Sequence, residues 1–207
     1  MDNKEIVKNT YNKISQQYFD VYYNNLDDKP YYDKFEKLLK KGATILDLGC
    51  GNGKTCKYFS ELGYKTLGLD FSDEMLKLAK KHSPNLNFKL KDITKFSFDK
   101  KFDGAIYAYS LFHLNEEQAE SSIQCVSNAL NSKSPLLLLL QKGKGEIIEP
   151  EPFNPSLQMY CKFYDEKEIS ELLNKHGFDI EELIVFAEPQ EDTALSNETM
   201  CVIAIKK

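Results

Sequence analysis

Residues 45–53 read ILDLGCGNG, and this stretch decides the fold. Ile45–Leu48 suit a buried strand, although Asp47 brings an ionisable side chain into it, and glycine then takes every second position at 49, 51 and 53. Glycine allows positive φ angles and lets a ligand approach the backbone closely. A buried strand that runs into such a loop predicts a ligand site at the carboxyl end of the strand.

Outward from this stretch, short apolar runs alternate with segments of helical spacing. Strands are predicted at 44–48, 65–69, 87–90, 102–110 and 135–141, and helices over 4–19, 31–39, 54–62, 71–82, 115–130 and 165–176. Two final strands, near 180–187 and 200–205, are separated by a polar loop and are expected to pair antiparallel. This order predicts an α/β fold with an open, mostly parallel sheet and an antiparallel C-terminal hairpin. Residues 142–164 are expected to be irregular.

Composition narrows the function classes. The 207 residues suffice for one domain, and a net charge of −5 gives no support to a nucleic-acid surface. The N-terminus lacks a secretory pattern, and the longest apolar run, Leu136–Leu140, is too short to span a bilayer. Five widely spaced cysteines without a CxxC pair favour neither disulfides nor a metal site. We therefore expect a cytoplasmic protein without bound metal or membrane partner.

Acidic residues lie at the carboxyl ends of three of the first four predicted strands, namely Asp47, Asp70 and Asp92. A row of carboxylates suits a ligand with hydroxyls, amines and positive charge better than a pyrophosphate. The spacing Gly49-x-Gly51-x-Gly53 also differs from the G-x-G-x-x-G pattern of dinucleotide sites. An acid about twenty residues beyond a glycine loop is typical of a site for a ribose diol, and an apolar residue beside Asp92 suits an adenine ring.

Four motifs together resemble the class I S-adenosylmethionine-dependent methyltransferases. They occur in the order LDLGCGNG, GLDFSDEML, LKDI and FDGAIYAYSLFHL. The resemblance extends to YNKISQQY near the N-terminus and to FYDEKEISELLNKHGFDI after the fifth strand. It implies a single Rossmann-like domain over residues 1–207 with a seven-stranded sheet and helices on both faces. It also implies a helical cap over residues 1–41 and a substrate-side loop over 142–164.

The resemblance also assigns roles by position. Gly49 and Gly51 would pass close to the methionine moiety of the cofactor, with Asp47 facing its ammonium group through water. Asp70 would bind the ribose hydroxyls and Asp92 the adenine amino group. Phe71 would lie along the adenine, Ala108 and Tyr109 would line the methyl-donor end, and a tyrosine of the first helix would close the pocket. The candidate cofactor-binding residues are Tyr11, Tyr18, Asp47, Gly49, Cys50, Gly51, Asp70, Phe71, Met75, Asp92, Ile93, Ala108 and Tyr109.

Structural roles remain open beside these functional ones. Asp47 can tie down its own loop, and Asp70 can cap the helix that follows it. Phe71 equally suits a half-buried core position, and Cys50 suits a small packing residue. His113 can serve as an orienting hydrogen-bond partner at the start of the next helix. Tyr11 and Tyr18 are likewise compatible with ordinary helix packing.

Methyl transfer from a sulfonium requires mainly an aligned acceptor and exclusion of water. If the acceptor is a hydroxyl or a protonated amine, a base helps, and His113 is the first candidate, followed by Tyr109. FDGAIYAYS lacks the Asn/Asp-Pro-Pro-aromatic signature of enzymes that methylate exocyclic amines of bases or glutamine amides, which disfavours those acceptors.

The sequence therefore predicts a monomeric or homodimeric methyltransferase that uses S-adenosylmethionine and acts on a small molecule, with no nucleic-acid partner. The alternatives are a non-catalytic S-adenosylmethionine-binding regulatory module and a methyltransferase for a protein or tRNA. An NAD-dependent or nucleotide-sugar enzyme on the same fold is disfavoured by Asp47 and by the glycine spacing.

Overall fold

The computed structural model describes residues 2–187 and 198–207. Its main sheet has seven strands in the order β3-β2-β1-β4-β5-β9-β8. The strands are β1 (Thr44–Leu48), β2 (Lys65–Asp70), β3 (Asn87–Leu90), β4 (Gly104–Ala108), β5 (Pro135–Gln141), β8 (Phe178–Ala187) and β9 (Glu198–Lys206). The first five run parallel, and β9 is antiparallel to both β5 and β8. This arrangement confirms the predicted α/β fold with its reversed last hairpin.

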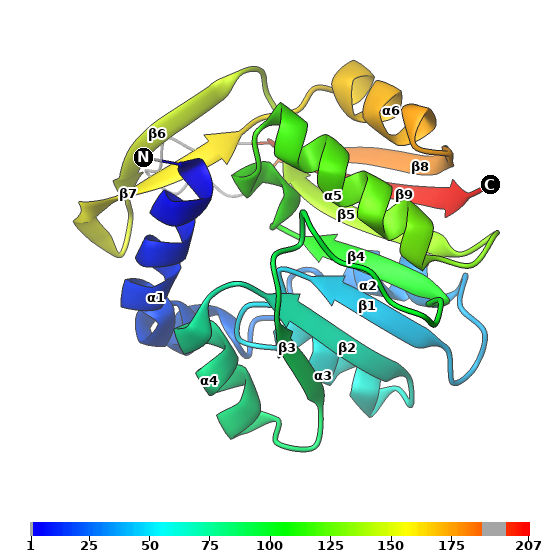
Figure 1. Ribbon diagram of the computed structural model, residues 1–207, viewed down its shortest axis with the longest axis horizontal. Coiled ribbons are helices and arrows are strands. Elements are labelled where there is room, and N and C mark those ends of the chain that lie inside the picture. The colour runs from blue at the N-terminus through cyan, green and yellow to red at the C-terminus, as the bar shows by residue number, and fades with distance from the viewer. Residues whose placement is uncertain (1, 188–197) are drawn as a thin grey trace.

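Helices cover both faces of this sheet, and one further helix crosses the end of it (Figure 1). They are α1 (Asn3–Tyr22), α2 (Lys29–Glu36), α3 (Lys54–Glu61), α4 (Asp73–His82), α5 (Glu116–Ala129) and α6 (Glu166–Lys175), with a short 3₁₀ turn η1 (Leu111–His113) after β4. In Figure 1, α5 and α6 lie in front of the sheet and α2 and α3 behind it. The first helix, α1, lies beyond the carboxyl ends of β1, β2 and β4.

Capping side chains begin four of these helices, and at α1 the Asp2 carboxylate accepts from the backbone N–H of Lys4. The Ser72 hydroxyl accepts from the backbone N–H of Met75, so α4 begins at Asp73, as expected from the sequence with Ser72 as the N-cap. Asn115 and Asp165 form reciprocal capping boxes at α5 and α6, as the sequence predicts for α6. The last three caps fix the points at which the chain leaves the strand ends.

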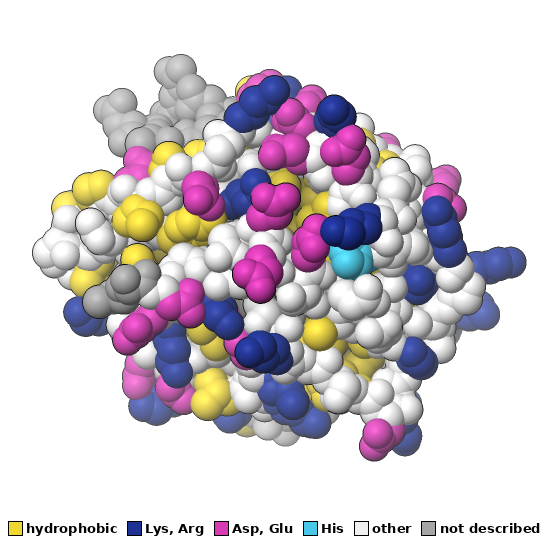
Figure 2. All heavy atoms as spheres, turned by 45° about the horizontal axis from the view of Figure 1, so that its top comes forward, with side chains coloured by type: hydrophobic (Ala, Val, Ile, Leu, Met, Phe, Trp, Pro, Cys, Tyr) yellow, Lys and Arg dark blue, Asp and Glu magenta, His cyan; other side chains and the backbone are white. Residues whose placement is uncertain are grey.

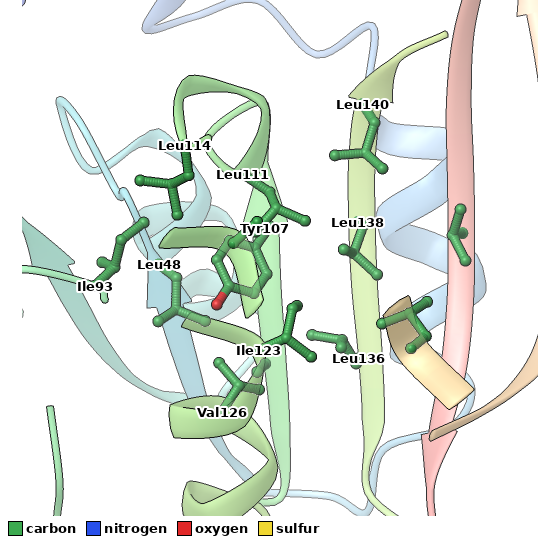
Figure 3. Close-up of a cluster of buried hydrophobic side chains, with 14 of the residues drawn as sticks. Leu48, Ile93, Tyr107, Leu111, Leu114, Ile123, Val126, Leu136, Leu138 and Leu140 are labelled. Atoms are coloured by element: carbon green, nitrogen blue, oxygen red, sulfur yellow. The ribbon is translucent and has the colours of Figure 1, made fainter. Parts of the chain in front are cut away.

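Alternation along the central strands divides the core between the two faces. Leu136, Leu138 and Leu140 of β5 pack with Tyr107 toward α5 and α6 (Figure 3). Leu137 and Leu139 face the other way and join the cluster that contains α2 and α3. Each fully buried leucine contributes about 1.5–3 kcal/mol. The strands are therefore held rigidly on both faces, and so are the loops at their ends.

The segment 142–164 differs from its expected irregular course. It forms a second, two-stranded antiparallel sheet of β6 (Glu146–Glu151) and β7 (Asn154–Lys162). A two-stranded ribbon tolerates proline at its edge positions, where no N–H is needed for a ladder. The β6–β7 hairpin packs against α1 and η1, and the Thr10 hydroxyl of α1 donates to the carbonyl oxygen of Gln158 at 2.7 Å.

The surface mixes both signs of charge. Lysine and acidic side chains are interspersed over the face in Figure 2, and hydrophobic side chains gather toward the end where Figure 1 places α1 and the β6–β7 hairpin. The exposed apolar side chains there include Val21 of α1 and Ile148 of β6. Among the helices described, none combines the length and the apolar character that crossing a membrane requires.

Candidate functional site

A pocket lies beyond the carboxyl ends of β1, β2 and β4, under α1. Its volume is about 660 Å³ when the open solvent at its mouth is included. The pocket is lined by Lys4, Tyr11, Tyr18, Gly49, Gly51, Asp70, Phe71, Met75, Asp92, Ile93, Ala108, Tyr109, Ser110, His113 and Leu114. The pocket wall thus combines residues from α1, the glycine loop, the ends of β2 and β4, and the turn after β3.

Two glycines of the loop after β1 line the pocket, and both have positive φ angles. Gly49 has φ +70°, and a Cβ there would lie 2.4 Å from the Cβ of Ser110, so only glycine fits. Gly51 has φ +51°, and a Cβ there would meet nothing within 4 Å. Because Gly51 lines the pocket, its bare backbone leaves room for a ligand to approach.

Asp70 ends β2 with its side chain only 5% exposed, and one pocket wall includes it. Its two carboxylate oxygens accept separately from the backbone N–H groups of Gly51 and Ser72, each at 2.8 Å. Burial raises the pKa of Asp70, and the hydrogen bonds from Ser72 and Gly51 oppose that shift. Each oxygen keeps an acceptor site, so the carboxylate is oriented to receive two further hydrogen bonds.

Asp47 and Cys50 lie beneath the loop, outside the pocket wall. The Asp47 carboxylate accepts from the Cys56 thiol at 3.2 Å and is 2% exposed. Burial raises the pKa of Asp47 to about 7. Cys50 packs among Cys56, Leu76 and neighbouring apolar side chains, as its packing interpretation predicts. The loop therefore rests on a buried, weakly solvated acid.

Asp92 follows β3 and stays partly exposed. The Lys4 ammonium of α1 lies 2.8 Å from its Oδ2, and the N–H and hydroxyl of Thr94 both donate to Oδ1. Burial favours a higher pKa for Asp92, but the Lys4 ammonium and the Thr94 donors outweigh it and hold the pKa below its usual value. Lys4 thus bridges α1 to the opposite wall of the pocket.

The end of β4 turns sharply at Tyr109, whose φ of +59° is unusual for a residue with a side chain. Its hydroxyl donates to the buried Asp28 carboxylate at 3.1 Å, and the Lys54 ammonium lies 2.8 Å from the same carboxylate. Strained backbone of this kind is often found at ligand sites. The strain at Tyr109 keeps both Ala108 and the ring of Tyr109 on the pocket wall.

His113 closes the η1 turn and is 8% exposed. Its Nδ1 lies 2.9 Å from the carbonyl oxygen of Tyr160 in β7, and its Nε2 lies 2.9 Å from the Tyr11 hydroxyl of α1. Burial lowers the pKa of His113 to about 4. Three distant segments of the chain therefore meet at this imidazole, on the pocket side opposite Asp70.

Polar side chains tether α1 over the pocket. The Asn12 side-chain oxygen accepts from the Ser72 hydroxyl at 2.6 Å, and the Lys8 ammonium lies 3.4 Å from the Asp73 carboxylate. The Tyr11 and Tyr18 rings meet edge to face with centroids 5.6 Å apart. These contacts hold α1 over one side of the pocket, although α1 precedes every strand of the sheet in the sequence.

Comparison with known proteins finds methyltransferases similar to part of this chain. Residues 45–133, from β1 through α5, match the sequence profile of the family described as "Methyltransferase domain". This matched stretch includes the glycine loop, Asp70, Asp92 and the end of β4. The chain is 34% identical over 116 residues to the protein described as methyltransferase 235L of Invertebrate iridescent virus 6, and the match covers 55% of this chain and 42% of that protein. The chain thus spans less than half the length of that relative.

Solved methyltransferase structures share the fold. The 1,6-didemethyltoxoflavin-N1-methyltransferase of Burkholderia thailandensis superposes with a TM-score of 0.78 at 18% identity, covering 99% of this chain and 88% of that one. The magnesium protoporphyrin IX methyltransferase of Synechocystis gives 0.76 at 17% identity, covering 100% of this chain and 98% of that one. At such identities the likeness concerns the fold.

The methyltransferase fold brings most of the predicted residues to one pocket, apart from Asp47 and Cys50. Three lining residues were not anticipated, namely Lys4, Ser110 and Leu114. Ser110 and Leu114 fall inside the quoted FDGAIYAYSLFHL motif, so their place in that motif is a weak indication that they line the pocket. No pattern in the sequence indicates Lys4, because it reaches Asp92 only through the docking of α1. Among the described residues no group of His, Cys, Asp and Glu side chains is arranged to hold a metal ion.

Proposed function

We propose that the protein transfers the methyl group of S-adenosylmethionine to a small-molecule acceptor in this pocket. The observation that carries the proposal is the buried Asp70 carboxylate, which is held by two backbone N–H groups and lines the pocket under α1. Its partners leave it suited to a ligand with two adjacent hydroxyls. The match of residues 45–133 to a methyltransferase domain supports S-adenosylmethionine as that ligand.

The residues present fit that cofactor. Its ribose diol has a partner in Asp70, and the space above Gly51 leaves the backbone approachable by its amino-acid moiety. The adenine has an apolar wall in Phe71, Met75 and Ile93. Asp92 can accept from the adenine amino group, provided that Lys4 yields part of its contact. The Asp70 carboxylate also contributes negative charge that favours a positively charged sulfonium.

Asp47 takes an indirect part in this proposal. Its carboxylate contacts Cys56 under the loop, so its charge acts on an ammonium group through the loop or through a bridging water. Cys50 fixes the loop by packing, without contact to the pocket. Both residues shape the site from behind.

The cofactor supplies an activated methyl group on a sulfonium. The chain's own task is to hold the acceptor in line with that group and to exclude water. Tyr109 and Ala108 form the wall where β4 ends, and Tyr11 and Tyr18 close the pocket from α1. The tethers of α1 to Ser72 and Gln158 keep this cover in place.

A small acceptor is favoured by the cover that α1 forms over the pocket. Helix α1 and the β6–β7 hairpin pack against each other and against η1, while no residue of 142–164 lines the pocket itself. We assign residues 142–164 to the acceptor side and α1 to the cap, while α2 packs on the rear face of the sheet. Among proteins of this fold, the two named above act on a toxoflavin precursor and on magnesium protoporphyrin IX according to their descriptions.

The test is transfer of label from methyl-labelled S-adenosylmethionine into a cell extract separated into metabolite, RNA and protein fractions. We expect label in the metabolite fraction, at a rate that depends on added protein. Label in RNA or protein would contradict the small-molecule acceptor. Calorimetric titration with S-adenosylhomocysteine runs beside it: tight binding without transfer to any fraction would indicate a non-catalytic binding module, and no binding at tens of micromolar would overturn the proposal altogether.

A further inference from the structure

We propose that Tyr11 and His113 form a proton relay that deprotonates the methyl acceptor, with Tyr11 contacting the acceptor and His113 receiving the proton behind it. The inference deepens the proposed function and rests on it. It assigns the acceptor to one chemical class: the attacking atom carries a proton that it must lose, as in a hydroxyl, a phenol or a protonated amine. An acceptor without such a proton, such as a thioether or a tertiary amine, would not use the pair.

Geometry fixes the tautomer of His113. A carbonyl oxygen can only accept, so the 2.9 Å contact between Nδ1 and the Tyr160 carbonyl requires a proton on Nδ1. In the neutral imidazole Nε2 is then an acceptor, and the hydroxyl of Tyr11, 2.9 Å away, must donate to it. The basic lone pair of His113 is therefore directed at Tyr11 and reaches the pocket only through that hydroxyl.

Tyr11 is placed to face both ways. It lines the pocket next to Tyr18, and its ring meets the His113 ring edge-on with centroids 5.4 Å apart. A hydroxyl that donates to His113 keeps lone pairs that can accept from another donor. The sequence-based assignment of His113 as a direct base is thereby changed: the structure puts Tyr11 between the imidazole and an acceptor.

The surroundings keep both groups neutral before reaction. Burial lowers the pKa of His113 to about 4, although its bond to the Tyr160 carbonyl favours the charged form. Burial also raises the pKa of Tyr11 well above its usual value, helped by the nearby acidic and phenolic groups on the elements packed around it. Those groups are Tyr18 of α1, Cys161 of β7, Asp70 of β2 and Glu151 of β6.

Methyl transfer and both proton transfers occur in one step. The acceptor atom forms its bond to the methyl carbon while the carbon–sulfur bond breaks, and the electron pair of that bond stays on sulfur. The proton of the acceptor passes to the Tyr11 oxygen as the Tyr11 proton passes to Nε2 of His113. The imidazolium that results donates from Nδ1 to the Tyr160 carbonyl and from Nε2 to Tyr11, and it loses its extra proton to water when the pocket opens.

The first test examines the pair without any acceptor. Nitrogen-15 spectra of the histidine side chains are recorded on the full chain with S-adenosylhomocysteine, for the wild type and for Tyr11→Phe. We expect the neutral Nδ1–H form of one histidine between pH 6 and 9, with an Nε2 resonance that moves when Tyr11 is replaced. His113→Gln assigns the resonance. An Nε2–H tautomer, or an imidazolium at pH 7, would overturn the relay.

The second test separates proton acceptance from positioning. Glutamine at 113 retains an acceptor for the Tyr11 hydroxyl but cannot take its proton. With the extract fraction that accepts the most label from the wild type, we expect His113→Gln and Tyr11→Phe each to lower the transfer rate by about 100-fold or more. Their affinity for S-adenosylhomocysteine should stay within about threefold of wild type, which shows that each variant is folded and keeps its cofactor site.

The pH dependence completes this test. The ratio of wild-type to His113→Gln rates should shrink as the pH rises from 7 to 9, because hydroxide then removes the proton. A ratio that stays constant over that range would reduce His113 to a structural role and overturn the relay, as would an unchanged rate in either variant. His176→Gln and Tyr64→Phe, which alter a histidine and a tyrosine remote from the pocket, are the matched controls and should transfer at the wild-type rate. A wild type that labels no fraction would instead count against the proposed function itself.

Discussion

The two sides of the pocket are built in different ways. The glycine-loop side, which comprises the ends of β1 and β2, is made of backbone groups and of a carboxylate that is already hydrogen-bonded, as in the contacts of Asp70 with Gly51 and Ser72. The cap side, which comprises α1, η1 and the β6–β7 hairpin, is held together by side chains from distant segments, such as Asn12 with Ser72 and Tyr11 with His113.

This difference indicates a division of labour. Loops at the ends of buried strands are held in place by the core, so they suit the binding of the proposed cofactor. A helix tethered by a few polar contacts can move at modest cost, so it suits access and acceptor chemistry. Changes on the glycine-loop side should therefore affect cofactor affinity and stability strongly, and changes in the tethers of α1 should affect them weakly.

The largest effect is expected for Asp70→Ala. Loss of two hydrogen bonds to a charged group should weaken S-adenosylhomocysteine binding by at least about 100-fold, measured by calorimetry. Asp103→Ala is the matched control, since Asp103 accepts from Thr44 at the opposite edge of the sheet. That control should lose stability and keep its affinity. Equal affinity in wild type and Asp70→Ala would remove the ribose contact from the proposal.

Alanine at the glycines tests the rigidity of the same loop. Gly49→Ala should lower the free energy of unfolding by about 2–4 kcal/mol in urea, because its Cβ meets Ser110 in a positive-φ conformation. Gly51→Ala should cost only about 1–2 kcal/mol but weaken cofactor binding. Gly63→Ala, with φ +92° and open space away from the pocket, carries the same kind of strain and should leave binding intact. Similar affinities for the Gly51 and Gly63 variants would contradict the close approach at Gly51.

A pH effect should report on Asp47 beneath the loop. Its folded pKa of about 7 lies above that of an unfolded aspartate, so the folded state holds a proton that the unfolded state has released. Stability should therefore fall as the pH rises from about 4 to about 7. Between pH 5 and 8 we expect the wild type to lose about 2 kcal/mol more than Asp47→Asn in urea unfolding. Parallel pH profiles for the two proteins would show that Asp47 is ionised in the fold.

The smallest effect is expected for Lys4→Met on the cap side. The Lys4–Asp92 pair is partly exposed, so its loss should change stability by less than about 1 kcal/mol. Binding of S-adenosylhomocysteine should improve by up to about threefold, because Asp92 becomes free for the adenine amino group. Lys8→Met removes a similar pair with Asp73 outside that pocket wall and serves as the control. A tenfold loss of affinity in Lys4→Met alone would make Lys4 part of the binding site.

Prediction from the sequence succeeded for the strands and for the pocket-lining residues that stand at strand ends. The runs before Gly49, Asp70 and Asp92 define strands by their apolar character, and parallel strands place their carboxyl ends at one edge. It failed for residues 142–164, where prolines suggest irregular chain but a two-stranded ribbon accommodates them. Lys4 was also missed, because periodicity says which face of a helix is apolar and nothing about the residue opposite it.

The sequence by itself determined the sheet, its order of elements and the row of acids at its edge, because these follow from local patterns that repeat every few residues. The tertiary structure decided that Asp47 lies below the loop while Asp70 lines the pocket. It also brought together Tyr11, His113 and the Tyr160 carbonyl, which lie far apart in the sequence. Contacts between such distant segments depend on how α1 and the β6–β7 hairpin dock, and packing of whole elements fixes that, with no trace in local spacing.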